Sequence, residues 1–186
     1  MTTLIALAII GLLVLGLVTT SINAYNRLVM LKFNVDKAFA NIDVLLKQRA
    51  DEIPNLIAVV KENMKYEEGV LNKLTQLRTN FLNTSSANEK IEISNEIEKT
   101  VKSIFAVSEN YPDLKSNNNF VMLQQRVSEI ENAIADRREF FNESVNAYNI
   151  GTHVFPEVIF ARLMGYQDKT LLRITEYEKK YDGVKF

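Results

Sequence analysis

The chain has 186 residues and a formal net charge of −1, from 22 basic and 23 acidic side chains. This balance excludes the basic excess that is typical of nucleic-acid-binding domains, so no nucleic-acid partner is expected. Cysteine is absent, which excludes disulfides, thiolate metal sites and a cysteine nucleophile.

The N-terminal segment predicts a membrane anchor. The first 26 residues carry no charge, and residues 4–22 form a nearly unbroken apolar run of nineteen residues. As a helix this run would reach about 28 Å, close to the ~30 Å hydrocarbon core of a bilayer. Signal peptides have shorter apolar cores, preceded by basic residues, and a small-residue cleavage site. We therefore predict a transmembrane anchor over residues 1–24 that contacts lipid through residues 4–22, with a cleaved signal peptide as the alternative.

Charge around the anchor predicts its orientation. All the basic residues follow the apolar run, beginning with Arg27, Lys32 and Lys37. Because basic flanks favour the cytoplasmic side, we expect a single-pass protein of the cell (inner) membrane. The N-terminus would lie outside and the C-terminal domain in the cytoplasm.

After the anchor, apolar residues recur every three or four positions from Val35 to Phe81. This spacing predicts one long helix, or two collinear ones. Pro54 lies inside the pattern and is expected to kink the helix rather than end it, because the period resumes at Leu56. Residues 83–88 then predict a loop ending in a helix cap.

Two further long helices are predicted. The first carries apolar residues from Ile93 to Phe105 and stops before Pro112, because the residue preceding a proline disfavours helical geometry. The second follows cap candidates at residues 116–119 and carries a near-heptad apolar seam from Phe120 to Tyr148.

Phe155-Pro156 opens a last amphipathic segment that runs to Leu163. No alternating strand pattern competes with these helices. The predicted fold is therefore all-α, with an N-terminal transmembrane helix followed by an antiparallel bundle of three to four long helices over residues 25–166. Residues 167–186 are charged and less periodic, and are predicted as a C-terminal tail.

Residues suited to catalysis are few. His153 is the only histidine, the six glycines form no phosphate-binding loop, and no glutamate precedes a histidine by three residues. We therefore predict no catalytic, cofactor-binding or metal site, no small-molecule substrate and no enzymatic activity. His153 is expected to be a surface or capping residue at a helix end.

A polar stripe is predicted beside the apolar seam of the third long helix, formed by Glu131, Arg138, Asn142 and Asn149 at spacings of 7, 4 and 7. These groups would be partly buried and need partners. The first long helix offers Asp43, Arg49, Asp51 and Asn55. The favoured interpretation is a network that fixes helix register, with Arg138 paired to Asp43 or Asp51. A ligand-binding pocket is the alternative.

Several ordered motifs resemble the LemA family of bacterial membrane proteins, over residues 24–166. They are Tyr25-Asn26-Arg27-Leu28-Val29, Ile42-Asp43-Val44-Leu45-Leu46, Asp51-Glu52-Ile53-Pro54-Asn55-Leu56, Tyr111-Pro112-Asp113-Leu114-Lys115, Asn119-Phe120, Glu131-Asn132, Arg138, Asn142, Tyr148-Asn149 and Phe155-Pro156. Three positions depart from the family pattern. Phe39 replaces a common tryptophan, Tyr66 a histidine and Phe141 a tyrosine; the two phenylalanines should conserve burial.

The resemblance implies a bundle of long helices behind an N-terminal transmembrane helix, usually without an assigned catalytic activity. It also implies that one branch of the family acts in building magnetosome membranes, and that members often occur near membrane metalloprotease genes.

Two functions stay open. The favoured one is a membrane-anchored scaffold or adaptor at the cytoplasmic face, acting through protein partners or as a homo-oligomer, because confinement to a surface raises effective concentration. The alternative is an accessory subunit that modulates a membrane enzyme such as an envelope metalloprotease.

Overall fold

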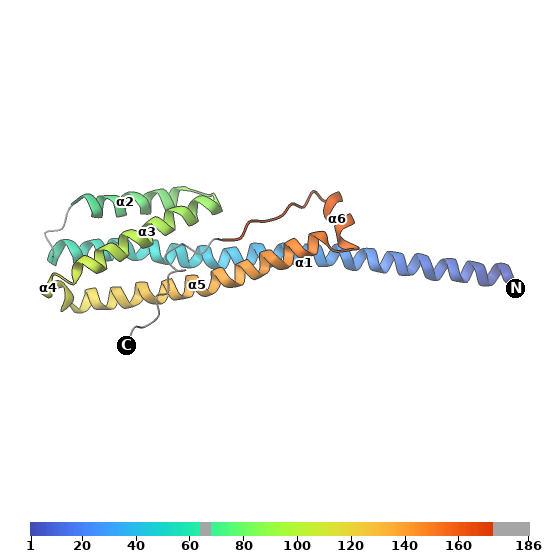
Figure 1. Cartoon of the computed structure of the whole chain (residues 1–186), viewed down its shortest axis with the longest axis horizontal. Helices are drawn as coiled ribbons and strands as arrows, with labels where there is room; N and C mark the ends of the chain where they lie inside the picture. Colours follow the sequence, from blue (N-terminus) through green and yellow to red (C-terminus); the bar gives the residue numbers. More distant parts are fainter. Residues whose placement is uncertain (64–67, 173–186) are drawn as a thin grey trace, which may run out of the picture. The chain divides into compact units, whose positions relative to one another are not determined.

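In the computed structural model, residues 1–63 and 68–172 are described, and within these ranges all the regular structure is helical. The helices are α1 (Thr2–Asn63), α2 (Glu68–Asn83), α3 (Ala87–Ser108), α4 (Pro112–Lys115), α5 (Asn118–His153) and α6 (Glu157–Leu163), as shown in Figure 1. The chain forms two compact units. Unit 1 contains Met1–Ala40 and Arg138–Phe186, and unit 2 contains Asn41–Arg137.

The start of α1 has the surface of a membrane span. Its most apolar window has a mean hydropathy of 2.6, and none of that window is buried within the protein. Burial begins just beyond the apolar run, at Ala24, which is 3% exposed, and Leu28, which is 0% exposed. An apolar helix that is exposed all round needs an apolar environment, so this segment is a candidate transmembrane helix. The all-α prediction and the predicted anchor helix agree with the structure.

Pro54 lies inside α1, which continues for nine residues beyond it. Ile53 and Leu56 on either side are 2% and 1% exposed, so packing stabilises the helix across the lost backbone hydrogen bond. The prediction that Pro54 does not end the helix is confirmed, and the bend angle stays a prediction.

The prediction of collinear helices from Val35 to Phe81 is wrong. Arg78 Nε on α2 donates a hydrogen bond of 3.1 Å to the Ala50 carbonyl on α1. This contact requires α2 to fold back along α1 within unit 2, and Figure 1 shows α2 and α3 lying side by side. The apolar period indicates which face is buried, but it does not indicate where a chain reverses direction.

Side-chain caps mark where α3 and α5 begin. Ser86 precedes α3, and its hydroxyl accepts a hydrogen bond from the Glu89 N–H at 3.5 Å. Asn117 Oδ1 accepts from the N–H groups of Asn119 and Phe120 at 2.9 and 3.3 Å at the start of α5. These three bonds satisfy donors that a helix end leaves unpaired, so the predicted caps are confirmed.

Each unit has its own apolar core. Unit 2 buries aliphatic and aromatic side chains from α1, α2, α3, α4 and α5, including Ile42, Leu74, Ile104, Leu114, Phe120 and Ile134. Unit 1 buries Val35 and Ala38 of α1 with Phe141, Val145 and Tyr148 of α5. Phe39 and Phe141 meet edge to face with ring centroids 6.1 Å apart. The expected burial of Phe141 is confirmed at 7% exposure, whereas Tyr66 lies outside the described residues.

Candidate functional site

Arg49 forms the centre of a buried charge network in unit 2. Its side chain on α1 is 1% exposed. One terminal nitrogen binds Glu131 of α5 and approaches Glu98 of α3 at 3.5 Å, and the other donates to the Ser94 hydroxyl of α3. Lys102 donates to the second Glu98 oxygen at 2.6 Å. One guanidinium therefore connects three helices, which is the geometry expected of an interhelical register lock.

Glu131 carries an electrostatic cost in this network. Burial raises the pKa of its carboxyl above the usual value, while the Arg49 charge lowers the pKa in part and the nearby Glu98 charge raises it. Desolvation is the largest of these effects. Ionised Glu131 is thus held at a free-energy cost that Arg49 offsets incompletely.

A second polar arrangement, which we call the asparagine ladder, consists of Asn142 and Asn149 on α5 in unit 1. Asn149 donates to the Lys169 carbonyl and accepts from the Lys169 N–H, both at 2.9 Å. Asn142 does the same with Leu172, at 3.0 and 2.9 Å. Each side-chain amide therefore satisfies both backbone groups of one residue.

The spacing of the ladder matches the segment that it binds. Seven residues of α-helix rise about 10.5 Å. In a polyproline-II-like extended chain, which has three residues per turn, three residues rise about 9.3 Å, and every third residue faces the same side of the chain. Residues 167–172, the docked segment, therefore run antiparallel to α5, with Lys169 opposite Asn149 and Leu172 opposite Asn142.

Side chains strengthen this docking. Lys169 Nζ binds Asp36 Oδ1 of α1 at 2.8 Å and lies 5.7 Å from the centre of the Tyr148 ring. Tyr148 also contacts the Tyr166 ring at 6.0 Å, and burial raises the pKa of the Tyr148 hydroxyl. The beginning of the segment predicted as a tail thus packs on α1 and α5 within unit 1, while residues 173–186 lie outside the described residues.

The structure divides the predicted polar stripe between these two arrangements. Glu131 binds Arg49, one of the groups that the first long helix was expected to offer to the stripe. Asp43 binds Lys90 at 2.8 Å and Asp51 binds Lys47 at 2.6 Å, so the carboxylates expected to face Arg138 are paired with lysines. Asn55 donates to Glu52. Arg138 itself is buried, at 6% exposure.

His153 is the last residue of α5, and its side chain is 67% exposed. Its Nδ1–H donates to the Asn149 carbonyl one turn earlier at 2.8 Å. This bond satisfies a carbonyl at the helix end, so the prediction of a surface or capping residue is confirmed. Among the described residues, no group of three or more acidic, histidine or cysteine side chains is placed to hold a metal ion.

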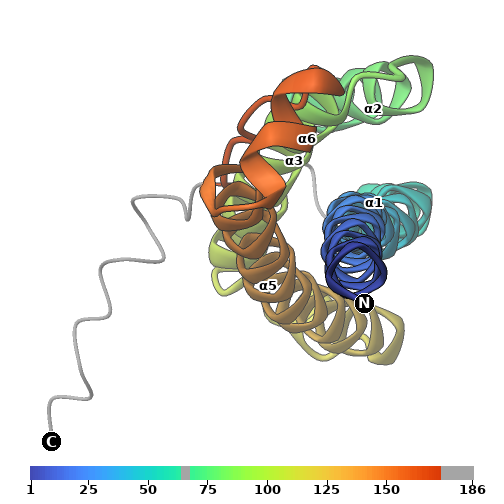
Figure 2. The ribbon, with the colours of Figure 1, turned by 90° about the vertical axis from the view of Figure 1, so that its right-hand side faces the viewer.

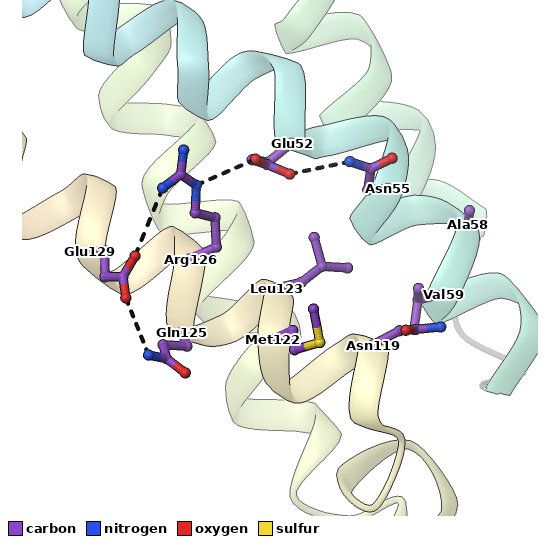
Figure 3. A pocket seen from close by; sticks show the side chains of 10 residues that line it. All are labelled: Glu52, Asn55, Ala58, Val59, Asn119, Met122, Leu123, Gln125, Arg126 and Glu129. Carbon is purple, nitrogen blue, oxygen red and sulfur yellow. Dashed lines mark hydrogen bonds and ion pairs between the residues drawn. The ribbon is translucent and has the colours of Figure 1, made fainter.

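A groove of about 600 Å³ lies between α1 and α5 in unit 2. Figure 3 shows Ala58, Val59, Met122 and Leu123 beside a chain of polar contacts. Arg126 lies 3.7 Å from Glu52 and 3.8 Å from Glu129, and Gln125 also binds Glu129. These charged groups are partly exposed and neutralise one another, which favours a surface salt-bridge network over a catalytic arrangement.

The sequence pattern did not predict the roles of Ser94, Glu98 and the docked segment. Ser94 and Glu98 are four residues apart on α3, and their shared helix face with the buried Ile97 and Val101 was the available signal. The two asparagines bind the docked segment through its main chain, and main-chain groups leave no side-chain pattern to find.

Comparison with known proteins agrees with the architecture. A model of the LemA family matches residues 38–186. The chain is similar to Magnetosome protein MamQ 2 and Magnetosome protein MamQ 1 of Paramagnetospirillum magneticum, each 23% identical over 189 residues that cover 87% of this chain and 70% of the relative. It is also similar to Magnetosome protein MamQ of Magnetospirillum gryphiswaldense, 20% identical over 190 residues that cover 87% and 69%. Because the family model spans most of the sequence, the chain belongs to the LemA family.

Proposed function

We propose that this protein is a membrane-anchored, non-enzymatic scaffold that organises proteins at the cytoplasmic face of the cell membrane, by self-assembly or by binding partners. The observation that carries the proposal is the continuity of α1. The helix leaves the apolar run at Ile22 and enters the core of unit 1 at Ala24 with no intervening linker. A helix is stiff over such a distance, so unit 1 is held at a fixed distance from the bilayer.

The partners that the polar-stripe residues bind support a structural role for the stripe. Glu131 binds Arg49, and both asparagines bind the chain's own backbone. Groups engaged in this way stabilise the fold and are not preorganised toward a substrate. The relatives named as magnetosome proteins fit a membrane-associated protein of this kind.

Confinement supplies the physical basis of scaffolding. Binding sites held in one membrane plane meet at a high effective concentration, so weak contacts between bundles suffice for assembly. The exposed faces of α2 and α5 offer side chains such as Leu82, Val121 and Met122 for such contacts.

Chemical crosslinking of the full chain in its native membrane tests the scaffold role. The expected result is a ladder of homo-oligomers or several partners at low stoichiometry. Recovery of one membrane enzyme at equal stoichiometry, with no homo-oligomer, would instead support the accessory-subunit function.

Orientation is tested separately by single-cysteine labelling, which the absence of native cysteine makes clean. Glu139 on α5 is exposed, so Glu139→Cys should react with a membrane-impermeant maleimide only after the cells are permeabilised. Thr3→Cys, on the other side of the span, is the matched control and should react in intact cells. Labelling of Glu139→Cys in intact cells would refute the cytoplasmic location.

A further inference from the structure

Helix α6 exposes large apolar side chains that no described part of the protein covers. Ile159 and Leu163, one helical turn apart, are 49% and 78% exposed, and Phe155 in the preceding turn is 80% exposed. Glu157 and Ala161 face inward, at 4% and 2% exposure. This short helix is therefore amphipathic, with its apolar side directed away from the core of unit 1.

An ion pair joins α6 to α1 near the end of the apolar run. Arg27 Nη1 binds Glu157 Oε1 at 2.9 Å, and the Glu157 side chain is only 6% exposed. Arg27 follows Ile22 by five residues, which corresponds to about 7.5 Å of helix. The headgroup region extends about 5–8 Å beyond the hydrocarbon core, so Arg27 and α6 fall at the level of the lipid headgroups.

The direction of α6 suits this location. Figures 1 and 2 show α6 lying crosswise to α1 within unit 1. A helix crosswise to a membrane span runs along the bilayer surface, which is the orientation of interfacial amphipathic helices.

We propose that α6 is an interfacial helix that inserts Phe155, Ile159 and Leu163 into the leaflet on the side of the bundle. The exposed apolar face of α6 would contact lipid at the boundary between headgroups and acyl chains. This lipid is continuous with the lipid around the candidate span. Arg162 lies beside Ile159 in a shallow groove of about 400 Å³ that also includes Val158 and Leu163. Its charge can reach lipid phosphate while its methylene stem covers apolar surface.

This second contact changes what the anchor does. One helix alone permits rotation about its own axis and tilting, whereas an attached interfacial helix gives the protein a defined face against the membrane. Unit 1 would thus present a fixed side to neighbours in the membrane plane, in whichever leaflet it lies.

Depth-dependent fluorescence quenching tests the proposal on the full chain. A fluorophore is attached to Ile159→Cys, and the protein is reconstituted into vesicles of phosphatidylcholine and phosphatidylglycerol. Lipids that carry a nitroxide high on the acyl chain should quench this probe several-fold more than a probe at Phe140→Cys. Phe140 is the matched control, because it is 48% exposed and lies next to Phe141, which packs on Phe39, about 25 Å of helix beyond Ile22.

Leu163→Cys supplies an independent second position and should be quenched like Ile159→Cys. Both variants replace exposed side chains, and circular dichroism spectra matching the parent protein confirm that they fold. Equal quenching at the α6 positions and at Phe140→Cys would overturn the proposal. Oxidation of Ile159→Cys to a disulfide-linked dimer in the vesicles would overturn it as well, because a second copy would then occupy this face.

Discussion

Replacing Arg49 by methionine removes the guanidinium that joins α1, α3 and α5, while the methionine retains much of the side-chain volume. Two carboxylates then remain in the interior of unit 2, with side-chain exposures of 10% for Glu98 and 20% for Glu131. Lys102 continues to neutralise Glu98, so the main cost falls on Glu131. The variant isolates the charge of Arg49 from its packing.

Removing one partner of a buried ion pair costs about 3–5 kcal/mol of unfolding free energy. A protein of this size shifts its midpoint by about 2–4 °C for each kcal/mol, so Arg49→Met should melt about 6–20 °C below the parent. The triple variant with Glu98→Gln and Glu131→Gln should recover most of this loss, because no unpaired charge stays buried.

Circular dichroism of the full chain in detergent micelles measures the melt, since the chain contains no tryptophan. The loss should shrink as the pH falls from 7 toward the ordinary glutamate pKa, because protonation of Glu131 removes the buried charge. A melting temperature within 2 °C of the parent at pH 7 would refute the reasoning. If the fall in melting temperature is the same at pH 7 and near the ordinary glutamate pKa, the lost packing of Arg49, and not its lost charge, is responsible.

Three further outcomes are expected. Asn149→Ala removes two hydrogen bonds to Lys169, worth about 1–3 kcal/mol together, so amide exchange at Lys169 should accelerate, whereas the exposed Asn146→Ala should leave it unchanged. The raised pKa of Glu131 means that the folded state binds its proton more tightly than the unfolded state does. The parent should therefore lose stability relative to Glu131→Gln as the pH rises through that folded-state pKa, which urea unfolding across the pH range measures. Ile134→Ala opens a cavity at a position that is 1% exposed and should cost about 2–5 kcal/mol; a loss below 1 kcal/mol in the same urea titration would contradict the assigned core.

Much of the fold is readable from the sequence because its determinants are local. Ser86 and Asn117 cap helices through bonds to residues two or three positions away, and such bonds depend on neighbouring residues alone. The apolar seam of α5 identifies Ile134 and Val145 as buried without reference to any other helix. The same seam makes Glu131 a candidate for a buried pair, which the contact with Arg49 confirms.

The features that sequence reasoning missed depend on nonlocal geometry. The apolar period from Val35 to Phe81 fits a straight helix and a reversed pair equally well, and the contact between Arg78 and Ala50 distinguishes them. The pairing of Arg138 with Asp43 or Asp51 stays a prediction, because a helical stripe specifies a direction and leaves the opposing element undetermined. The partners of Asn142 and Asn149 are main-chain groups, which every residue type except proline supplies equally.

The asparagine ladder therefore constrains the two asparagines of α5 more strongly than the residues of the docked segment. The two asparagines must be kept for their paired donors and acceptors, while the residues between Lys169 and Leu172 are free to diverge. Proline alone is excluded at positions 169 and 172, where an N–H group is bound. Relatives that use the same device should keep the seven-residue spacing on the helix and show little resemblance in the segment that it holds.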